Sequence, residues 1–131
     1  MESAYVPLLV VSAALSAVCL LQFVMTQVGA TRGMGPNRLA GIKTKATLAS
    51  EGAWSAGHAA AQPALLTAAV TGFGLAIPLA LWQASSDTDP TPAFTVVCAV
   101  SAVAVAVLFG LAVHRANRAA RHITNNGGEQ K

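Results

Sequence analysis

Residue types that can move protons gather in one short segment of the chain. Glu51, Trp54, Ser55, His58 and Gln62 are spaced by three or four positions, so on an α-helix they share one face. A carboxylate and an imidazole on one face suit acid–base chemistry. However, Glu51 and His58 are two helical turns apart, and neither a nucleophile nor a set of metal ligands accompanies them. We therefore expect Glu51 to cap the helix, Trp54 to anchor at a membrane interface and His58 to hydrogen-bond within a helix bundle.

Three basic residues precede this face and alternate with apolar ones. Arg38, Lys43 and Lys45 lie among leucine and isoleucine residues. This arrangement lets the apolar side chains enter a membrane interface while the cations stay with the lipid headgroups. The pattern indicates a segment at a membrane surface that can contact anionic groups.

Capping residues mark where the helix begins. Thr47 or Ser50 can accept a hydrogen bond from the first free amides of the helix, and Glu51 places a carboxylate at the positive end of the helix dipole. Upstream, Gly41 allows a backbone conformation that other residues resist. Pro63 starts the next apolar run. These signals predict a short helix at the cytoplasmic interface, just before that run.

Three long uncharged stretches must position this segment. No Asp, Glu, Lys or Arg occurs in residues 3–31, 52–86 or 90–114, and each stretch is long enough to cross the roughly 30 Å of hydrocarbon in a bilayer. We expect transmembrane helices at 6–28, 63–82 and 94–113, a loop at 29–62 and a tail at 114–131. The expected fold class is all-α: a polytopic membrane protein in which residues 1–131 form a single membrane domain.

The overall composition agrees with a membrane protein. Of the 131 residues, 54% are hydrophobic and 10% are charged, whereas roughly 25% charged is usual in soluble domains. This excludes a soluble globular enzyme, a disulfide scaffold and a nucleic-acid-binding domain. Cys19 and Cys98 lie in apolar stretches without a CxxC pattern or a neighbouring histidine, so we predict no metal site and no cofactor.

The basic residues predict the orientation of the chain. All eight Lys and Arg residues fall in the loop at 29–62 or in the tail. The connection between the second and third spans carries Asp87 and Asp89 and no basic residue, and Glu2 precedes the first span. The positive-inside rule places the basic segments in the cytoplasm. We therefore expect the N-terminus outside and the C-terminus in the cytoplasm.

The tail places its basic residues along one helical face. Arg115, Arg118 and Arg121 or His122 are three or four positions apart. One interpretation is a flank held to anionic lipid headgroups by about 1 kcal/mol per basic residue. The other is a docking face for an acidic partner.

The first span carries a polar stripe. Its members are Ser12, Ser16, Cys19, Gln22 and Thr26, and such a stripe is expected to pack on another helix through interhelical hydrogen bonds. None of the three spans contains a charged residue. Because ion-coupled transport pathways generally use intramembrane charges, the sequence argues against a transporter.

The loop resembles a known family signature. The 23 residues from Pro36 to His58 are similar to the signature of the SdpI family of bacterial integral membrane proteins. That signature runs approximately Asn, a short gap, Gly-Ile-Arg-Thr, a gap, Thr-Leu, Ser or Asn, an acidic residue, and then Trp and His or Asn on one helix. Lys43 stands here where the family usually has Arg, which keeps the charge and loses the bidentate fork.

The resemblance implies a protein of the bacterial cytoplasmic membrane of the immunity and signalling kind. The founding member, which has additional spans, protects its producer from a secreted toxic peptide and, when engaged, holds a transcriptional repressor at the membrane. The residues implied as partner- or anion-binding are Asn37, Arg38, Gly41, Lys43, Thr44, Thr47, Ser50, Glu51, Trp54 and His58.

Three functions remain open at this point. The first is a non-enzymatic immunity or signal-transduction protein that binds a toxin peptide or a regulatory partner. The second is a small accessory or structural subunit of a homo- or hetero-oligomer, packed by its small residues. The third is an enzyme that handles lipid headgroups, with Glu51 or His58 transferring a proton beside an anion held by basic residues of the loop. We favour the first, and predict neither catalytic residues nor a nucleic-acid partner.

Overall fold

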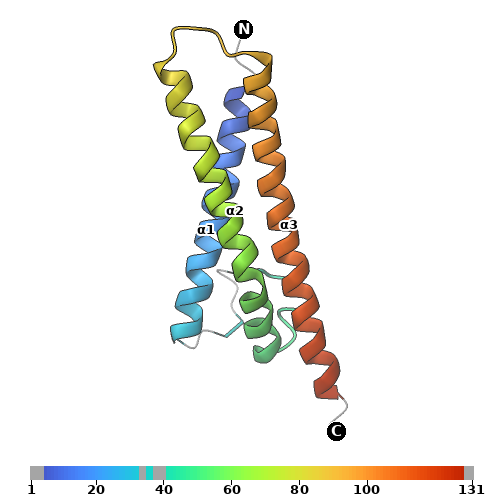
Figure 1. Ribbon diagram of the computed structural model, residues 1–131. Helices are drawn as coiled ribbons and strands as arrows, with labels where there is room; N and C mark the ends of the chain where they lie inside the picture. The colour runs from blue at the N-terminus through green and yellow to red at the C-terminus, as the bar shows by residue number, and fades with distance from the viewer. Residues whose placement is uncertain (1–4, 33–34, 37–40, 129–131) are drawn as a thin grey trace.

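Three long α-helices lie side by side in the computed structural model, which describes residues 5–32, 35–36 and 41–128 (Figure 1). They are α1 (Tyr5–Arg32), α2 (Glu51–Ser85) and α3 (Pro92–Gly128), and each contacts the other two. The described residues contain no β-strand. The start of α1 and the turn at 86–91 lie at one end of the bundle, and the segment 41–50 and the end of α3 lie at the other. The all-α prediction is confirmed.

All three helices are long and apolar enough to cross a membrane, which confirms the expected polytopic membrane protein. They contain 28, 35 and 37 residues, which corresponds to about 42, 52 and 55 Å at 1.5 Å per residue. Each expected span lies within one helix, but α2 begins well before residue 63 and α3 continues well beyond residue 113. Because the hydrocarbon core is only about 30 Å thick, these two extensions reach past it at the same end of the bundle.

The short interfacial helix is not confirmed as a separate element. Helix α2 begins at Glu51 and continues through Pro63 into the second span. Proline removes one backbone donor, but membrane helices tolerate it where neighbouring helices and hydroxyl side chains support the backbone. Alanines occupy positions 59–61 and favour helix on the N-terminal side. On the other side, the Thr67 hydroxyl donates to the Pro63 carbonyl at 2.8 Å.

Small residues form the core of the bundle. Gly72 lies where the three helices meet: a Cβ added there would overlap Ser16 Oγ on α1 and would lie 2.9 Å from Val105 Cγ2 on α3. Around it, α2 and α3 bury mainly alanines. In lipid, glycine and alanine at the helix interfaces let the helix backbones approach closely and gain van der Waals contact.

The polar stripe of α1 faces this core, as predicted. Ser12, Ser16 and Cys19 are fully buried, and Thr26 is buried. The Ser12 hydroxyl shares a hydrogen bond of 3.3 Å with the Ser101 hydroxyl on α3. The other two hydroxyls donate within α1, from Ser16 to the Ser12 carbonyl and from Thr26 to the Gln22 carbonyl. The stripe therefore supplies one of the expected interhelical bonds.

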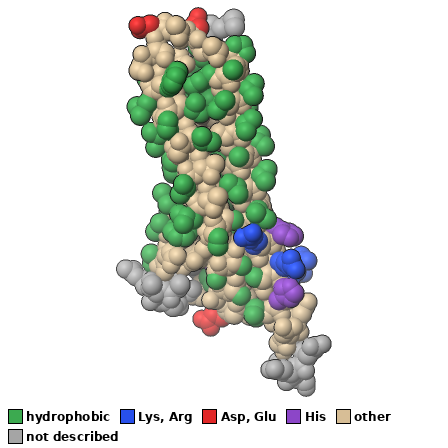
Figure 2. All heavy atoms as spheres, in the orientation of Figure 1, with side chains coloured by type: hydrophobic (Ala, Val, Ile, Leu, Met, Phe, Trp, Pro, Cys, Tyr) green, Lys and Arg blue, Asp and Glu red, His purple; other side chains and the backbone are tan. Residues whose placement is uncertain are grey.

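Large apolar side chains cover the outside of the bundle. Val10 on α1, Leu81 on α2 and Val107 on α3 are each at least 60% exposed. Figure 2 shows hydrophobic side chains along most of the length of one face, with Lys, Arg and His gathered near the C-terminal end of α3. An apolar exterior with charge confined to the ends is what a lipid-embedded protein requires.

Candidate functional site

The helix α2 begins at a side-chain cap. Ser50 has extended backbone angles (φ −160°, ψ 165°), and its Oγ accepts a hydrogen bond from the Ala53 amide at 3.0 Å. A serine in this position satisfies one of the amides that have no partner within the helix. Glu51 follows in the first turn. Of the two caps that the sequence left open, Ser50 takes this role.

Thr47 instead holds a hydrogen-bonded turn just before the cap. Its Oγ1 accepts from the Thr44 amide at 3.0 Å, and its own amide donates to Thr44 Oγ1 at 3.2 Å. The Thr47 hydroxyl also donates to the Ile42 carbonyl at 2.7 Å. The Thr47 side chain is fully buried, so these bonds are shielded from water and fix the path of the turn.

His58 fastens this segment to α2. The Ile42 amide donates to His58 Nε2 at 2.8 Å, and His58 Nδ1 lies 2.8 Å from the Trp54 carbonyl. Since Nε2 accepts, the proton of the neutral imidazole is on Nδ1 and is donated to that carbonyl. The imidazole ring also lies 4.0 Å from the Trp54 ring, between centroids. The predicted hydrogen bonding of His58 within the bundle is confirmed.

Gly41 makes the approach to these two rings possible. Its φ is +105°, a region that side chains rarely permit. A Cβ added at Gly41 would lie 2.5 Å from His58 Nε2 and 2.7 Å from Trp54 Cη2. Backbone angle and space therefore both require glycine here.

The same segment is also attached to α3. The Thr44 hydroxyl donates to Asn117 Oδ1 on α3. Close to this bond, Gly57 on α2 packs tightly against both the segment and α3. A Cβ added at Gly57 would lie 2.9 Å from Thr47 Cγ2 and 3.0 Å from the Ala116 carbonyl oxygen. We call residues 41–50 together with Trp54, Gly57, His58 and Asn117 the clasp, because they join the loop to the extensions of α2 and α3 beyond the expected spans.

The predicted binding residues divide into an internal and an external group. Six lie within the contacts of the clasp and have been described above: Gly41, Thr44, Thr47, Ser50, Trp54 and His58. The side chains of Lys43 and Glu51 are exposed, as is that of Lys45. Asn37 and Arg38 lie outside the described residues.

Two expectations about the α2 face need correction. Trp54 is only 7% exposed and packs under Gly41, so its indole does not anchor at a membrane interface; the loop folds back over it. The face is also divided, because His58 is buried whereas Glu51 and Ser55 are exposed. In the described part of the chain, the two nitrogens of the His58 imidazole bond to Ile42 and Trp54 and not to the Glu51 carboxylate.

Sequence reasoning missed two members of the clasp. Gly57 stands in an alanine-rich helix, where an isolated glycine is a signal of close backbone approach. Asn117 is a polar residue without charge between Arg115 and Arg118, but no local pattern connects it to Thr44, which is 73 positions away.

The arrangement stabilises a loop rather than positioning reacting groups. Both nitrogens of His58 are used in hydrogen bonds, so neither is left to accept a proton from a substrate. Within residues 5–32, 35–36 and 41–128, no three His, Cys, Asp or Glu side chains gather as metal ligands do. What the clasp presents to the surroundings is a rigid surface with charged side chains on it.

Comparison with known proteins gives one match. The model of the SdpI/YfhL protein family matches residues 34–112, which is 79 of the 131 residues. This range contains the whole clasp except Asn117, together with α2 and nearly all of the apolar part of α3. No curated protein and no solved structure matches the chain.

Proposed function

The chain belongs to the SdpI/YfhL protein family, and from this premise we propose that it is an immunity or signal-transduction protein. In this proposal it resides in the bacterial cytoplasmic membrane and acts by binding a toxin peptide or a regulatory protein rather than by catalysis. Its three membrane-length helices fit a multi-pass protein of this type.

The observation that carries this proposal is the use of the family signature inside the clasp. Its threonines bond to each other, its histidine accepts from the Ile42 amide, and its glycine packs against the rings of Trp54 and His58. The signature therefore builds a surface instead of an active site. A buried and fully bonded polar network specifies one conformation. The backbone that carries the exposed side chains of Lys43, Lys45 and Glu51 is thereby ordered before a partner binds, which lowers the entropic cost of binding.

The distribution of basic residues supports the orientation used here. Every described Lys and Arg side chain lies at the end of the bundle that carries the clasp, and Asp87 and Asp89 lie in the turn at the other end. With the positive end in the cytoplasm, the clasp faces cytoplasmic partners, and the acidic turn faces the exterior from which a secreted peptide arrives.

A survival assay tests the immunity role. A strain lacking the gene is exposed to the conditioned medium of its own parent, and survival is compared with complementation by the wild type and by the K43A/K45A variant. We expect the deletion strain to lose viability, the wild type to restore it and the variant to fail, because the variant lacks two charges of the proposed contact surface. Immunoblots of the membrane fraction verify that the variant is inserted at wild-type levels.

The matched control is R115A. Arg115 is an exposed basic residue on α3 outside the family match, so this variant is expected to protect normally. Full viability of the deletion strain in the conditioned medium contradicts the immunity role. Equal protection by wild type and K43A/K45A contradicts the placement of the binding surface at the clasp.

A further inference from the structure

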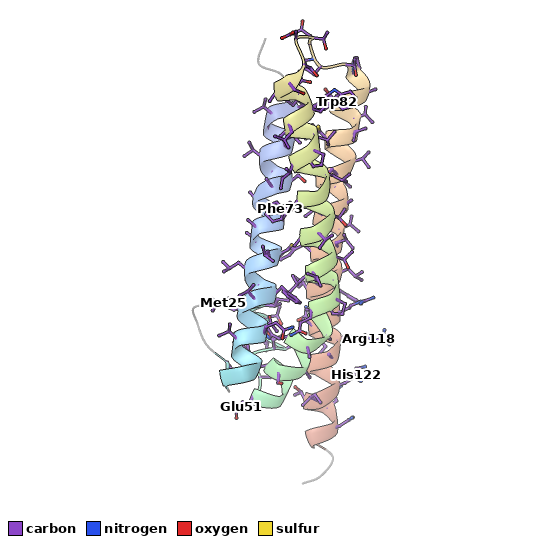
Figure 3. All side chains as sticks on the ribbon, turned by 60° about the vertical axis from the view of Figure 1, so that its left-hand side comes forward. Met25, Glu51, Phe73, Trp82, Arg118 and His122 are labelled. Atoms are coloured by element: carbon purple, nitrogen blue, oxygen red, sulfur yellow. The ribbon has the colours of Figure 1, made fainter. Side chains whose placement is uncertain are left out.

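A second polar feature lies on α3, outside the family match. It is an open groove of about 310 Å³ that is lined by basic and amide side chains: His114, Asn117, Arg118, Arg121, His122 and Asn125. All six follow residue 112, where the matched region ends. Spacings of three and four place them on one face of the helix, over about 16 Å of its length. Figure 3 shows Arg118 and His122 pointing outward from α3.

The groove begins where the hydrocarbon must end. The uncharged run that forms the third span stops at His114, and Arg118 follows about 6 Å further along the helix axis. Lipid phosphates occupy the zone just outside the hydrocarbon core, since the headgroup layers make the bilayer some 10–15 Å thicker than the core. The first half of the groove is therefore at phosphate level, and a side chain as long as that of Arg121 is able to extend toward this level.

No described acidic side chain neutralises the groove. Asp87 and Asp89 lie in the turn at the opposite end of α3, and Figure 3 shows Glu51 on the other side of the bundle from Arg118 and His122. Two guanidinium groups thus share one groove without an ion pair to any described carboxylate. An anion with more than one oxygen matches this set, because guanidinium donates in a fork that fits phosphate.

Asn117 adds a neutral donor that the clasp orients. Its Oδ1 accepts from the Thr44 hydroxyl, so the Nδ2 group is the part of the amide that remains available to donate. Asn117 also lines the groove. The clasp thereby determines which atom of this amide is offered to a ligand there.

We propose that this groove binds the headgroup of an anionic phospholipid, with the phosphate held by Arg118 and Arg121 and by the amide of Asn117. A lipid is favoured over an acidic protein segment because the groove starts at the hydrocarbon boundary and continues the apolar surface of α3. Asn117 belongs to the clasp, but Arg118 and Arg121 lie outside both the clasp and the region that matches the family, so changing these two arginines leaves the proposed immunity surface intact.

The test is a binding titration on the purified full-length protein in neutral detergent. Dioctanoyl phosphatidylglycerol, the phosphatidylcholine with the same chains, inorganic phosphate and a glutamate-rich peptide are titrated separately and followed by microscale thermophoresis. We expect saturable binding of phosphatidylglycerol and weaker binding of the other three. The R118Q/R121Q variant is expected to bind phosphatidylglycerol about 25-fold more weakly, at about five-fold per basic residue.

The matched control is R115Q, which removes an exposed charge from the same helix without touching the groove. It is expected to change the affinity by less than two-fold or so, as a general charge effect would. Equal losses in R115Q and R118Q/R121Q overturn the proposal, because they indicate undirected attraction. The proposal is also overturned if inorganic phosphate binds as tightly as phosphatidylglycerol, or if only the peptide binds. If the double variant is not obtained folded, R118Q alone is expected to show the five-fold loss.

A survival experiment keeps this result separate from the immunity role. R118Q/R121Q is expected to protect cells as the wild type does if the groove serves only lipid. A negative lipid titration therefore contradicts the lipid site without contradicting the immunity role. A negative survival assay contradicts the immunity role without contradicting the lipid site.

Discussion

At the scale of single residues, the clasp shows a histidine used for structure. His58 has the chemical groups of a general base, but its two nitrogens bind the Ile42 amide and the Trp54 carbonyl. A buried amide without a partner costs about 1–3 kcal/mol, so His58 contributes to stability by satisfying Ile42. Gly41 contributes to stability because it has no side chain, since any Cβ there would overlap the rings of Trp54 and His58.

Replacing Gly41 with alanine is expected to destabilise the protein by roughly 2 kcal/mol or more, through an unfavourable positive φ and the overlap with His58. Thermal unfolding in detergent, followed by tryptophan fluorescence, measures the change. The control is Gly74→Ala, on α2, where an added Cβ has nothing within 4 Å and alanine favours the helix. A Gly41→Ala variant as stable as Gly74→Ala would refute the structural role given to this glycine.

Part of this site follows from the sequence and part does not. The cap at Ser50, the special backbone at Gly41 and the bond from His58 to the Trp54 carbonyl are local effects, which the order of residues specifies. The burial of Trp54 and the bond between Thr44 and Asn117 depend on how the loop folds over α2 and meets α3. Such contacts join distant parts of the chain, and helical periodicity carries no information about them.

At the scale of elements, the three helices could be predicted from their uncharged runs, but the length of α2 could not. Pro63 was a reasonable place for a helix to begin, and the structure instead carries one helix through it. The difference arises because the clasp and α3 support the N-terminal part of α2, including Gly57 against Ala116. Tertiary packing thus outweighs the tendency of proline to begin a helix rather than lie inside one.

The packing of the three helices leaves no room for a side chain at Gly72. We expect Gly72→Ala to lower the free energy of unfolding by about 1–3 kcal/mol, the usual range for an overfilled core, because the new methyl group overlaps Ser16 on α1 and meets Val105 on α3. Thermal unfolding of the purified protein in detergent provides the measurement. Gly110→Ala, which has open space around the added Cβ, is the control and is expected to leave the unfolding temperature unchanged or slightly raised. If the two variants unfold alike, the helices do not meet at Gly72 as described.

At the scale of the whole molecule, the two ends of the bundle differ in charge. The acidic turn at 86–91 is at one end, and the clasp and the basic groove are at the other. Under the orientation proposed here, a cysteine placed in the turn is accessible from outside the cell, and one placed on the extension of α3 is not.

Thr88→Cys and Thr124→Cys test this orientation as a matched pair, since both positions are exposed. In intact cells, a membrane-impermeant maleimide is expected to label Thr88→Cys and not Thr124→Cys, and permeabilised cells are expected to show labelling of both. The native cysteines, Cys19 and Cys98, are buried and give little background. Labelling of Thr124→Cys alone in intact cells would reverse the orientation.

The continuity of α3 has a mechanical consequence. After Pro92 it contains no further proline through Gly128, so about 55 Å of unbroken helix connects the turn at 86–91 to the residues that hold Thr44 and line the basic groove. A helix of this length acts as a lever: a tilt of 10° about its outer end carries the far end sideways by about 10 Å. Under the orientation proposed here, a small displacement of the turn at 86–91 outside the cell becomes a large movement of the cytoplasmic end of α3.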